Sequence, residues 1–198
     1  MIEELVRRTR TVRRFVEQKP VETTLLRAWV DLARLGGSAR NAQPLKYMIV
    51  TEETQRTRLF PLLGWAGYLS DWPGPGPGER PAAYIVCLLD TGLARGPESE
   101  AHFDLGIATQ NLLLGAATHG VFGCRIGAFS ADKVHRLLEL EQRFKVLLVL
   151  ALGYPAETVV VEEVGPDGDI RYWHDALGVH HVPKRSLTEV LVCPPMPK

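Results

Sequence analysis

The feature that most constrains this fold is a long helical segment, residues 99 to 119, that is apolar on nearly all sides. Ser99 can cap its start, and Gly120 ends it. Small residues recur every seven positions on one side, at Ala101, Ala108 and Gly115, and these let another backbone approach closely. A helix that is apolar on its opposite side as well is buried on most sides. In a chain of 198 residues, the pattern predicts that a second subunit covers one of its faces.

Helices and buried strands alternate along the rest of the chain. Continuous apolar runs are typical of strands buried on both faces, and they predict strands at 47–51, 82–90 and 145–153. Helical spacing predicts helices at 2–9 and 22–35, and a further helix that Ser130 caps. Two β segments should flank the Pro-Asp-Gly turn within 158–175. The alternation indicates one domain, residues 1–198, of the α/β or α+β class.

Charge and cysteine content exclude several classes of function. Lys+Arg 23 balance Asp+Glu 23, so nothing draws the whole chain to nucleic acid or to an anionic membrane. No apolar run is long enough to span a bilayer. Three cysteines without a CxxC pair, and no apolar leader at the start, suit a reducing cytoplasm. The adjacent His180 and His181 point apart in a strand, so we expect no metal site.

Positive charge is concentrated near the start of this neutral chain, with five arginines in the segment 7–14. Arg10 and Arg13 are three residues apart, so they share a face of a helical turn, with the Thr11 hydroxyl between them. Two guanidinium groups and a hydroxyl together suit a phosphate monoester. The alternative is a solvated basic helix end, and that reading fits Arg7, Arg8 and Arg14.

Two other segments carry polar side chains that suit a ligand. The turn 36–47 contains Ser38, Asn41 and Gln43, whose donors and acceptors can hold a polyol and the edge of a heterocycle; a simple polar turn is the alternative. Near the end, Lys184 and Arg185 add two cations, which alone would be a surface pair. The fingerprints G-x-G-x-x-G, G-x-x-x-x-G-K-[ST] and G-x-S-x-G are absent.

Taken in order, these pieces resemble the FMN-dependent nitroreductase family over nearly the whole chain. An R-S-x-R-x-F-like stretch is matched by Arg10, Thr11, Arg13 and Phe15. An S-x-x-N-x-Q-P turn is matched by Ser38, Asn41, Gln43 and Pro44. A D-x-x-x-A-x-x-N-L-x-x-A helix is matched by Asp104, Ala108, Asn111, Leu112 and Gly115. The segments CRIGAF and LALGYPAE and the late basic pair resemble further family features, whereas Thr11, Gly36-Gly37 and Leu45 depart from the usual residues.

The resemblance implies a role for each matched segment. The FMN phosphate would be held by Arg10, Thr11 and Arg13, with Lys184 or Arg185 completing its cage. Ribityl and ring atoms would meet Ser38, Asn41 and Gln43, some of them from the partner subunit. The flavin edge would lie at Ile126 and Gly127, with the Gly127 amide near N5. The implied fold is an α+β sandwich, in which helices flank a central antiparallel-type sheet, in an intertwined homodimer.

The implied activity is transfer of hydride from NAD(P)H through flavin N5 to an electron-poor acceptor such as a nitroaromatic or a quinone, in a ping-pong cycle. No side chain need act as a catalytic acid or base. The segment 62–80 would be a substrate lid carrying Trp65, Tyr68 and Trp72, with aromatic packing under a loop as the alternative. Other hypotheses are a dehalogenase or flavin-cleaving enzyme on the same fold, a flavin-binding storage or sensor protein, and a basic interaction module without cofactor.

Overall fold

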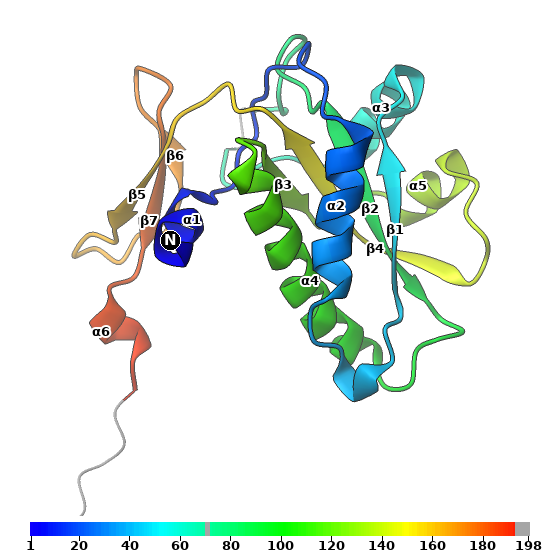
Figure 1. Ribbon diagram of the computed structural model, residues 1–198. Coiled ribbons are helices and arrows are strands. Elements are labelled where there is room, and N and C mark those ends of the chain that lie inside the picture. Colours follow the sequence, from blue (N-terminus) through cyan, green and yellow to red (C-terminus); the bar gives the residue numbers. More distant parts are fainter. Residues whose placement is uncertain (70–71, 193–198) are drawn as a thin grey trace, which may run out of the picture.

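A four-stranded antiparallel sheet forms the centre of the molecule (Figure 1). The computed structural model describes residues 1–69 and 72–192. The strand order is β1-β2-β4-β3, formed by β1 (Leu45–Val50), β2 (Ala83–Asp90), β4 (Phe144–Gly153) and β3 (Phe122–Ile126). Every residue of β2 is buried, as its continuous apolar run predicted.

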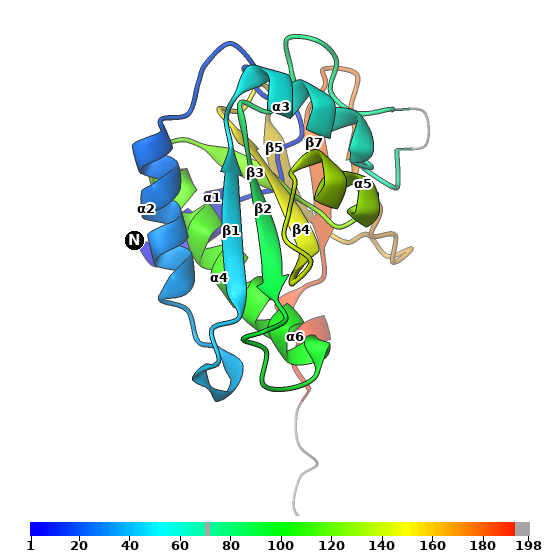
Figure 2. The ribbon, with the colours of Figure 1, turned by 90° about the vertical axis from the view of Figure 1, so that its right-hand side faces the viewer.

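Helices pack on both faces of this sheet (Figure 2). On one face lie α2 (Thr23–Arg34) and α4 (Glu98–Thr118), and on the other lie α3 (Glu53–Leu59) and α5 (Ala131–Leu137). Alternate residues of β2 serve the two layers, because Ile85 and Cys87 pack toward α2 and α4 while Tyr84 and Val86 pack toward α3 and α5. The mixed α+β architecture with a flanked antiparallel sheet confirms the fold class that the sequence indicated.

The long helix α4 is confirmed, with one correction to its start. Its N-cap is Pro97 rather than Ser99, and the helix begins at Glu98. Acidic residues in its first turn suit the positive end of the helix dipole. Gly115, in the stripe of small residues, faces α2: a Cβ there would lie 2.5 Å from Leu32 Cδ1 and 3.1 Å from Trp29 Cδ1, so side chains of the same chain cover this position. Another part of α4 stays uncovered, because Phe103 is 73% exposed.

A second, three-stranded sheet follows β4 in the chain. Its order is β5-β7-β6, formed by β5 (Val159–Glu163), β7 (His180–Lys184) and β6 (Trp173–His174). The two predicted β segments exist, but they do not pair with each other: β7 lies between them, parallel to β5 and antiparallel to β6.

Short helices complete the described part of the chain. They are α1 (Ile2–Arg8), η1 (Ala39–Asn41), η2 (Phe60–Leu62) and α6 (Leu187–Val190). Sequence analysis missed α3, β3 and both η helices. Within residues 1–69 and 72–192, no helix has the length and apolar character needed to cross a membrane.

Candidate functional site

The segment after α1 is fixed beside β3, and this places the N-terminal arginines. Val12 N donates to Gly123 O at 3.2 Å, in a parallel bridge between Thr11 and Gly123. Phe15 is fully buried against Gly153, where a Cβ would lie 2.9 Å from the Phe15 ring. These contacts anchor the stretch directly after Arg10 and on both sides of Arg13.

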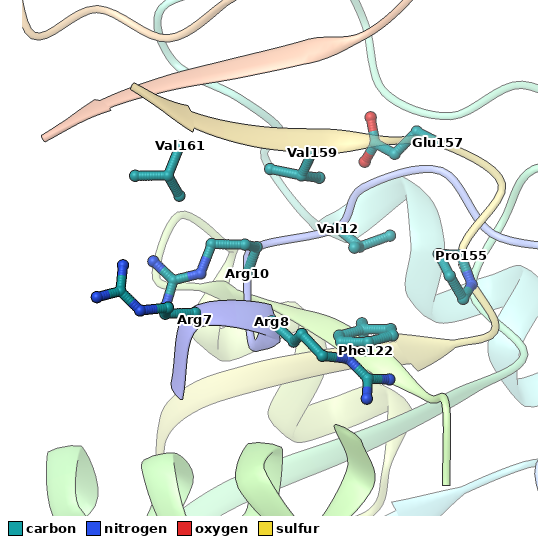
Figure 3. Close-up of a pocket in the computed structure, with 9 residues that line it drawn as sticks. All are labelled: Arg7, Arg8, Arg10, Val12, Phe122, Pro155, Glu157, Val159 and Val161. Carbon is teal, nitrogen blue, oxygen red and sulfur yellow. The ribbon is translucent and has the colours of Figure 1, made fainter. Parts of the chain in front are cut away.

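A cavity of about 360 Å³ opens between α1 and β5. Figure 3 shows Arg10 between α1 and the two valines of β5. The lining combines three cations with apolar groups and one acid: Arg7, Arg8, Arg10, Val12, Phe122, Pro155, Glu157, Val159 and Val161. Arg8, which the sequence assigned to a solvated helix end, therefore also lines the cavity.

Arg10 brings an incompletely paired cation to the cavity wall. Its Nη2 donates to Val6 O at 2.6 Å, whereas its Nε is buried without an acceptor. Burial lowers the pKa of Arg10. Arg7 pairs with Glu3 at 3.0 Å, but among residues 1–69 and 72–192 neither Arg8 nor Arg10 has a carboxylate within 4.0 Å. The wall thus carries positive charge that an anion can compensate.

Arg13 does not line this cavity. Its Nη1 lies 3.3 Å from His180 Nε2, and its guanidinium group stacks 4.5 Å above the centre of the Tyr172 ring. The backbone amides of Arg13 and Arg14 both donate to Glu157 Oε1, which orients that carboxylate. The structure thus separates Arg13 from Arg10, although the sequence grouped them.

The polar turn 38–43 is held by an acid from α4. Ser38 Oγ donates to Asp104 Oδ2 at 2.6 Å, and Ala39 N donates to Asp104 Oδ1 at 2.9 Å. The backbone N–H of Gln43 donates to Ser38 Oγ at 3.0 Å. Arg40, Asn41 and Gln43 have left-handed φ values of 55°, 51° and 50°. Asp104 is 5% exposed, and sequence analysis missed its function as the anchor of this turn.

A second cavity, of about 340 Å³, lies beside the turn, and its lining includes Ser38, Gln43, Tyr47 and Asp104. Burial, reinforced by Cys87 and Asp104, raises the pKa of Tyr47. Asn41 is exposed and does not line this cavity.

The two halves of the predicted cofactor site lie far apart within one chain. The turn 38–43 contacts α4 at Asp104, whereas α1 lies beside Thr118 at the other end of that helix. At 1.5 Å per residue, these points on α4 are about 20 Å apart along the helix axis. Figure 1 shows η1 below the lower end of α4, away from α1. A single chain does not bring these predicted ligands together.

The remaining predicted cofactor residues lie at the ends of strands. Ile126 ends β3 in a buried position, and Gly127 is exposed, with open space where a Cβ would stand. Lys184 ends β7 in register with Glu163, and Arg185 Nη1 lies 3.4 Å from Glu189. Neither member of the basic pair lines the cavity at Arg10.

The aromatic residues of the predicted lid segment 62–80 each pack against a different partner. Trp65 packs 5.7 Å from the Phe60 ring, and its indole covers Gly74, where a Cβ would lie 2.7 Å away. Tyr68 lies 5.1 Å from the Tyr172 ring. Residues 70 and 71 of this segment lie outside the described part of the chain. The Trp72 ring lies 5.7 Å from the guanidinium group of Arg14.

A polar cluster that the sequence did not predict joins Glu157, His174 and the buried His180. Burial, followed by the charges of Arg13, His174 and His181, lowers the pKa of His180 to about 4. Sequence analysis missed this cluster, because its members are scattered along the chain and match no ligand spacing. His181 meets different partners, Glu162 and Asp175, as expected for adjacent residues of a strand.

Known proteins resemble this chain in sequence and in fold. A curated relative from Methanothermobacter thermautotrophicus, whose name contains "NADH dehydrogenase/NAD(P)H nitroreductase", is 25% identical over 158 residues, which is 78% of this chain and 77% of the relative. The crystal structure of a nitroreductase family protein from Streptococcus pneumoniae superposes with a TM-score of 0.70 at 20% identity, covering 98% of this chain and 100% of that one.

A second solved structure, the NADPH:FMN oxidoreductase from Vibrio harveyi complexed with NAD⁺, has a TM-score of 0.61 at 24% identity and covers 78% of this chain and 68% of that one. Both structures show that the fold is shared. The sequence model described as the nitroreductase family matches residues 6–154. The polar turn, the N-terminal arginines and helix α4 all fall inside that match, and the chain belongs to the nitroreductase family.

Proposed function

We propose that the chain binds FMN and passes hydride from NAD(P)H to an electron-poor acceptor such as a nitroaromatic or a quinone. Membership of the nitroreductase family makes it an oxidoreductase enzyme, and its relatives support dependence on NAD(P)H. FMN supplies the hydride chemistry when bound, and the protein supplies binding and orientation. The coenzyme leaves before the acceptor enters, so the cycle is ping-pong.

The observation that carries this proposal is the incompletely paired guanidinium of Arg10 in the wall of a cavity. A phosphate monoester offers several charged acceptor oxygens, which suit the Nε that lacks an acceptor. Arg8 adds a second cation, and the exposed Thr11 adds a hydroxyl close in sequence. Glu157 is the one acid in the lining, and two backbone amides already stabilise its carboxylate. The donor set therefore fits an anionic cofactor.

The other predicted ligands require rearrangement or a partner. Arg13 reaches a phosphate in the Arg10 cavity only after it leaves His180. Lys184 and Arg185 reach it only if the C-terminal segment moves toward this cavity. Ser38, Asn41 and Gln43 lie about 20 Å from the N-terminal arginines along α4, which supports a site completed by the turn of a second subunit. In a two-fold dimer, the turn 38–43 of each subunit would complete the cofactor site of the other subunit.

Exposed apolar residues supply a surface for such a homodimer. On α4, Phe103 and Ile107 are exposed, and Leu35 is exposed just after α2. Three apolar residues near one another on a single layer of helices suit burial against a second copy.

Around the ring, the chain acts by orientation rather than by proton transfer. Ile126 ends β3 and Gly127 follows it; we assign both to the flavin edge, because Gly127 offers its backbone amide without a side chain to obstruct approach. The segment 62–80 borders this edge, because Gly64 N donates to Ala128 O at 2.6 Å. We assign Trp65, Tyr68 and Trp72 to the substrate side on this ground.

An anaerobic titration of the purified, flavin-loaded protein with NADH and then NADPH tests the function. A reductase loses its yellow colour rapidly with at least one coenzyme and regains it when a quinone or nitroaromatic is added. A yellow protein that neither coenzyme bleaches would contradict the proposal and favour storage or sensing. Release of halide from an added halogenated aromatic, or cleavage of the flavin ring after oxygen is admitted to the reduced protein, would instead indicate the alternative enzymes on this fold.

A further inference from the structure

Glu157, His174 and His180 lie close together outside the part of the chain that matches the family model. Glu157 precedes β5, His174 belongs to β6, and His180 begins β7. The side chains of Glu157 and His174 are 2% and 20% exposed, and His180 is 1% exposed. The small sheet and the residue before it thus bring together two imidazoles and a carboxylate, of which His174 is the most exposed.

The spacing of these groups suits ligands around one small cation. His180 Nδ1 lies 3.0 Å from His174 Nε2, which lies 3.4 Å from Glu157 Oε2. All three atoms lie within 4.8 Å of one another. Zinc bonds to nitrogen and oxygen are about 2.0–2.2 Å long, so tetrahedral ligand atoms lie roughly 3.3–3.5 Å apart. The separations of 3.0 Å and 3.4 Å are close to this value.

Hydrogen bonds alone do not satisfy the cluster while Glu157 is ionised. Arg13 Nη1 only donates, so its 3.3 Å contact requires His180 Nε2 to accept. A neutral His180 then carries its hydrogen on Nδ1 and donates it to His174 Nε2. His174 Nε2 is then an acceptor that faces Glu157 Oε2, another acceptor, in a buried place. One more positive centre is needed between these atoms.

We propose that Glu157 Oε2, His174 Nε2 and His180 Nδ1 form a binding site for a divalent transition-metal cation of the zinc type. One cation gives all three atoms a common partner once the His180 hydrogen has moved from Nδ1 to Nε2, and the more exposed side at His174 leaves a fourth position for water. Glu157 Oε1 keeps its bonds from the amides of Arg13 and Arg14, which orient the ligating oxygen. The metal ties the small sheet to the N-terminal segment.

The contact between Arg13 and His180 changes when a metal binds. Metal binding through Nδ1 moves the remaining hydrogen to Nε2, which then faces a donor on Arg13. Arg13 therefore competes with the metal, and metal binding releases it. The release would free Arg13 for a phosphate, a consequence that rests on the proposed function.

Zinc uptake by the full chain tests the site. Chelator-treated, flavin-free protein is dialysed against Zn²⁺, and bound metal is measured by mass spectrometry. We expect one equivalent in the wild type, which Glu157→Gln and His174→Asn lose and His102→Asn keeps. The amide side chain in Glu157→Gln retains an oxygen for the two backbone amides, and His102 is an exposed histidine on α4. Absence of stoichiometric zinc in the wild type, or equal uptake by all variants, would overturn the proposal.

Two further measurements sharpen the result. Co²⁺ in place of Zn²⁺ should give the strong visible absorption of a four-coordinate site, and His174→Asn should lose this absorption. Weak bands typical of six-coordinate Co²⁺ alone would contradict the proposed four-coordinate geometry. Arg13→Met keeps a side chain over Tyr172 without the charge, so it should bind Zn²⁺ about tenfold more tightly. Unchanged or weaker binding would refute competition by Arg13. Because flavin is absent throughout, failure here leaves the FMN proposal standing.

Discussion

Replacing Arg10 by alanine isolates the charge that the cavity offers to a phosphate. Nη2 already donates to Val6 O, so the ligand gains chiefly from Nε, which is buried without an acceptor. One hydrogen bond to a charged group contributes about 1.5–3 kcal/mol. The dissociation constant of FMN should therefore rise about 10- to 100-fold, as measured by quenching of flavin fluorescence on titration with flavin-free protein.

The same substitution should leave the flavin-free protein no less stable. Removing a buried donor that has no acceptor relieves its desolvation cost, and the lost bond to Val6 O is partly solvated. Denaturant unfolding without FMN measures this. The combination of weakened binding and retained stability distinguishes a ligand contact from a structural one.

Two variants control for charge and geometry. Arg58→Ala removes the same charge from an exposed position on α3, on the opposite layer, and should bind FMN as the wild type does. Arg10→Lys keeps the charge but loses the guanidinium fork, so its affinity should be intermediate. If Arg10→Ala binds FMN as tightly as Arg58→Ala, the cavity is not the phosphate site and the reasoning from its unpaired cation is wrong.

Three other predictions test the packing, the thiols and the dimer. Gly115→Ala places a Cβ 2.5 Å from a leucine of α2 and should lower the unfolding free energy by about 1–3 kcal/mol. Gly106→Ala, in open space on the same helix, should raise the unfolding free energy by about 0.5–1 kcal/mol. Equal effects of the two substitutions would contradict the packing of Gly115 against α2. Burial raises the pKa of Cys87 to about 12 and that of Cys124, so at pH 8 neither thiol should react with iodoacetamide before denaturation; peptide mass spectrometry that finds native labelling would disagree. Phe103→Asp should yield monomers in sedimentation without loss of monomer stability, and an unchanged dimer would exclude this surface.

Sequence patterns predicted the strands that are buried on both faces and the helix that is buried along one stripe. β2 and β4 lie at the centre of the sheet, so both of their faces are apolar and the runs are continuous. α2 has one apolar stripe, which gives it helical spacing. By contrast, β3 is short and contains Gly123 and Arg125, and it is a strand because it pairs with β4. α3 is a short polar helix of which only Leu59 is buried, so it leaves almost no periodic signal.

The predicted site residues were chosen from local motifs, whereas their arrangement depends on distant contacts. The motif residues of the polar turn were all quoted, but the shape of the turn depends on Asp104, more than sixty residues later. Likewise, spacing placed Arg13 beside Arg10, whereas contact with the distant His180 and Tyr172 turns its side chain away. Local spacing limits which side chains can meet, and long-range packing decides which of them do.

Binding of FMN to the purified full chain tests the central claim most directly. Protein freed of flavin is mixed with excess FMN, dialysed and examined in the visible spectrum. The account predicts retained flavin absorbance at one FMN per chain, reduced in Arg10→Ala and unchanged in Arg58→Ala. A colourless wild-type protein after dialysis, with no heat released on titration with FMN, would contradict it.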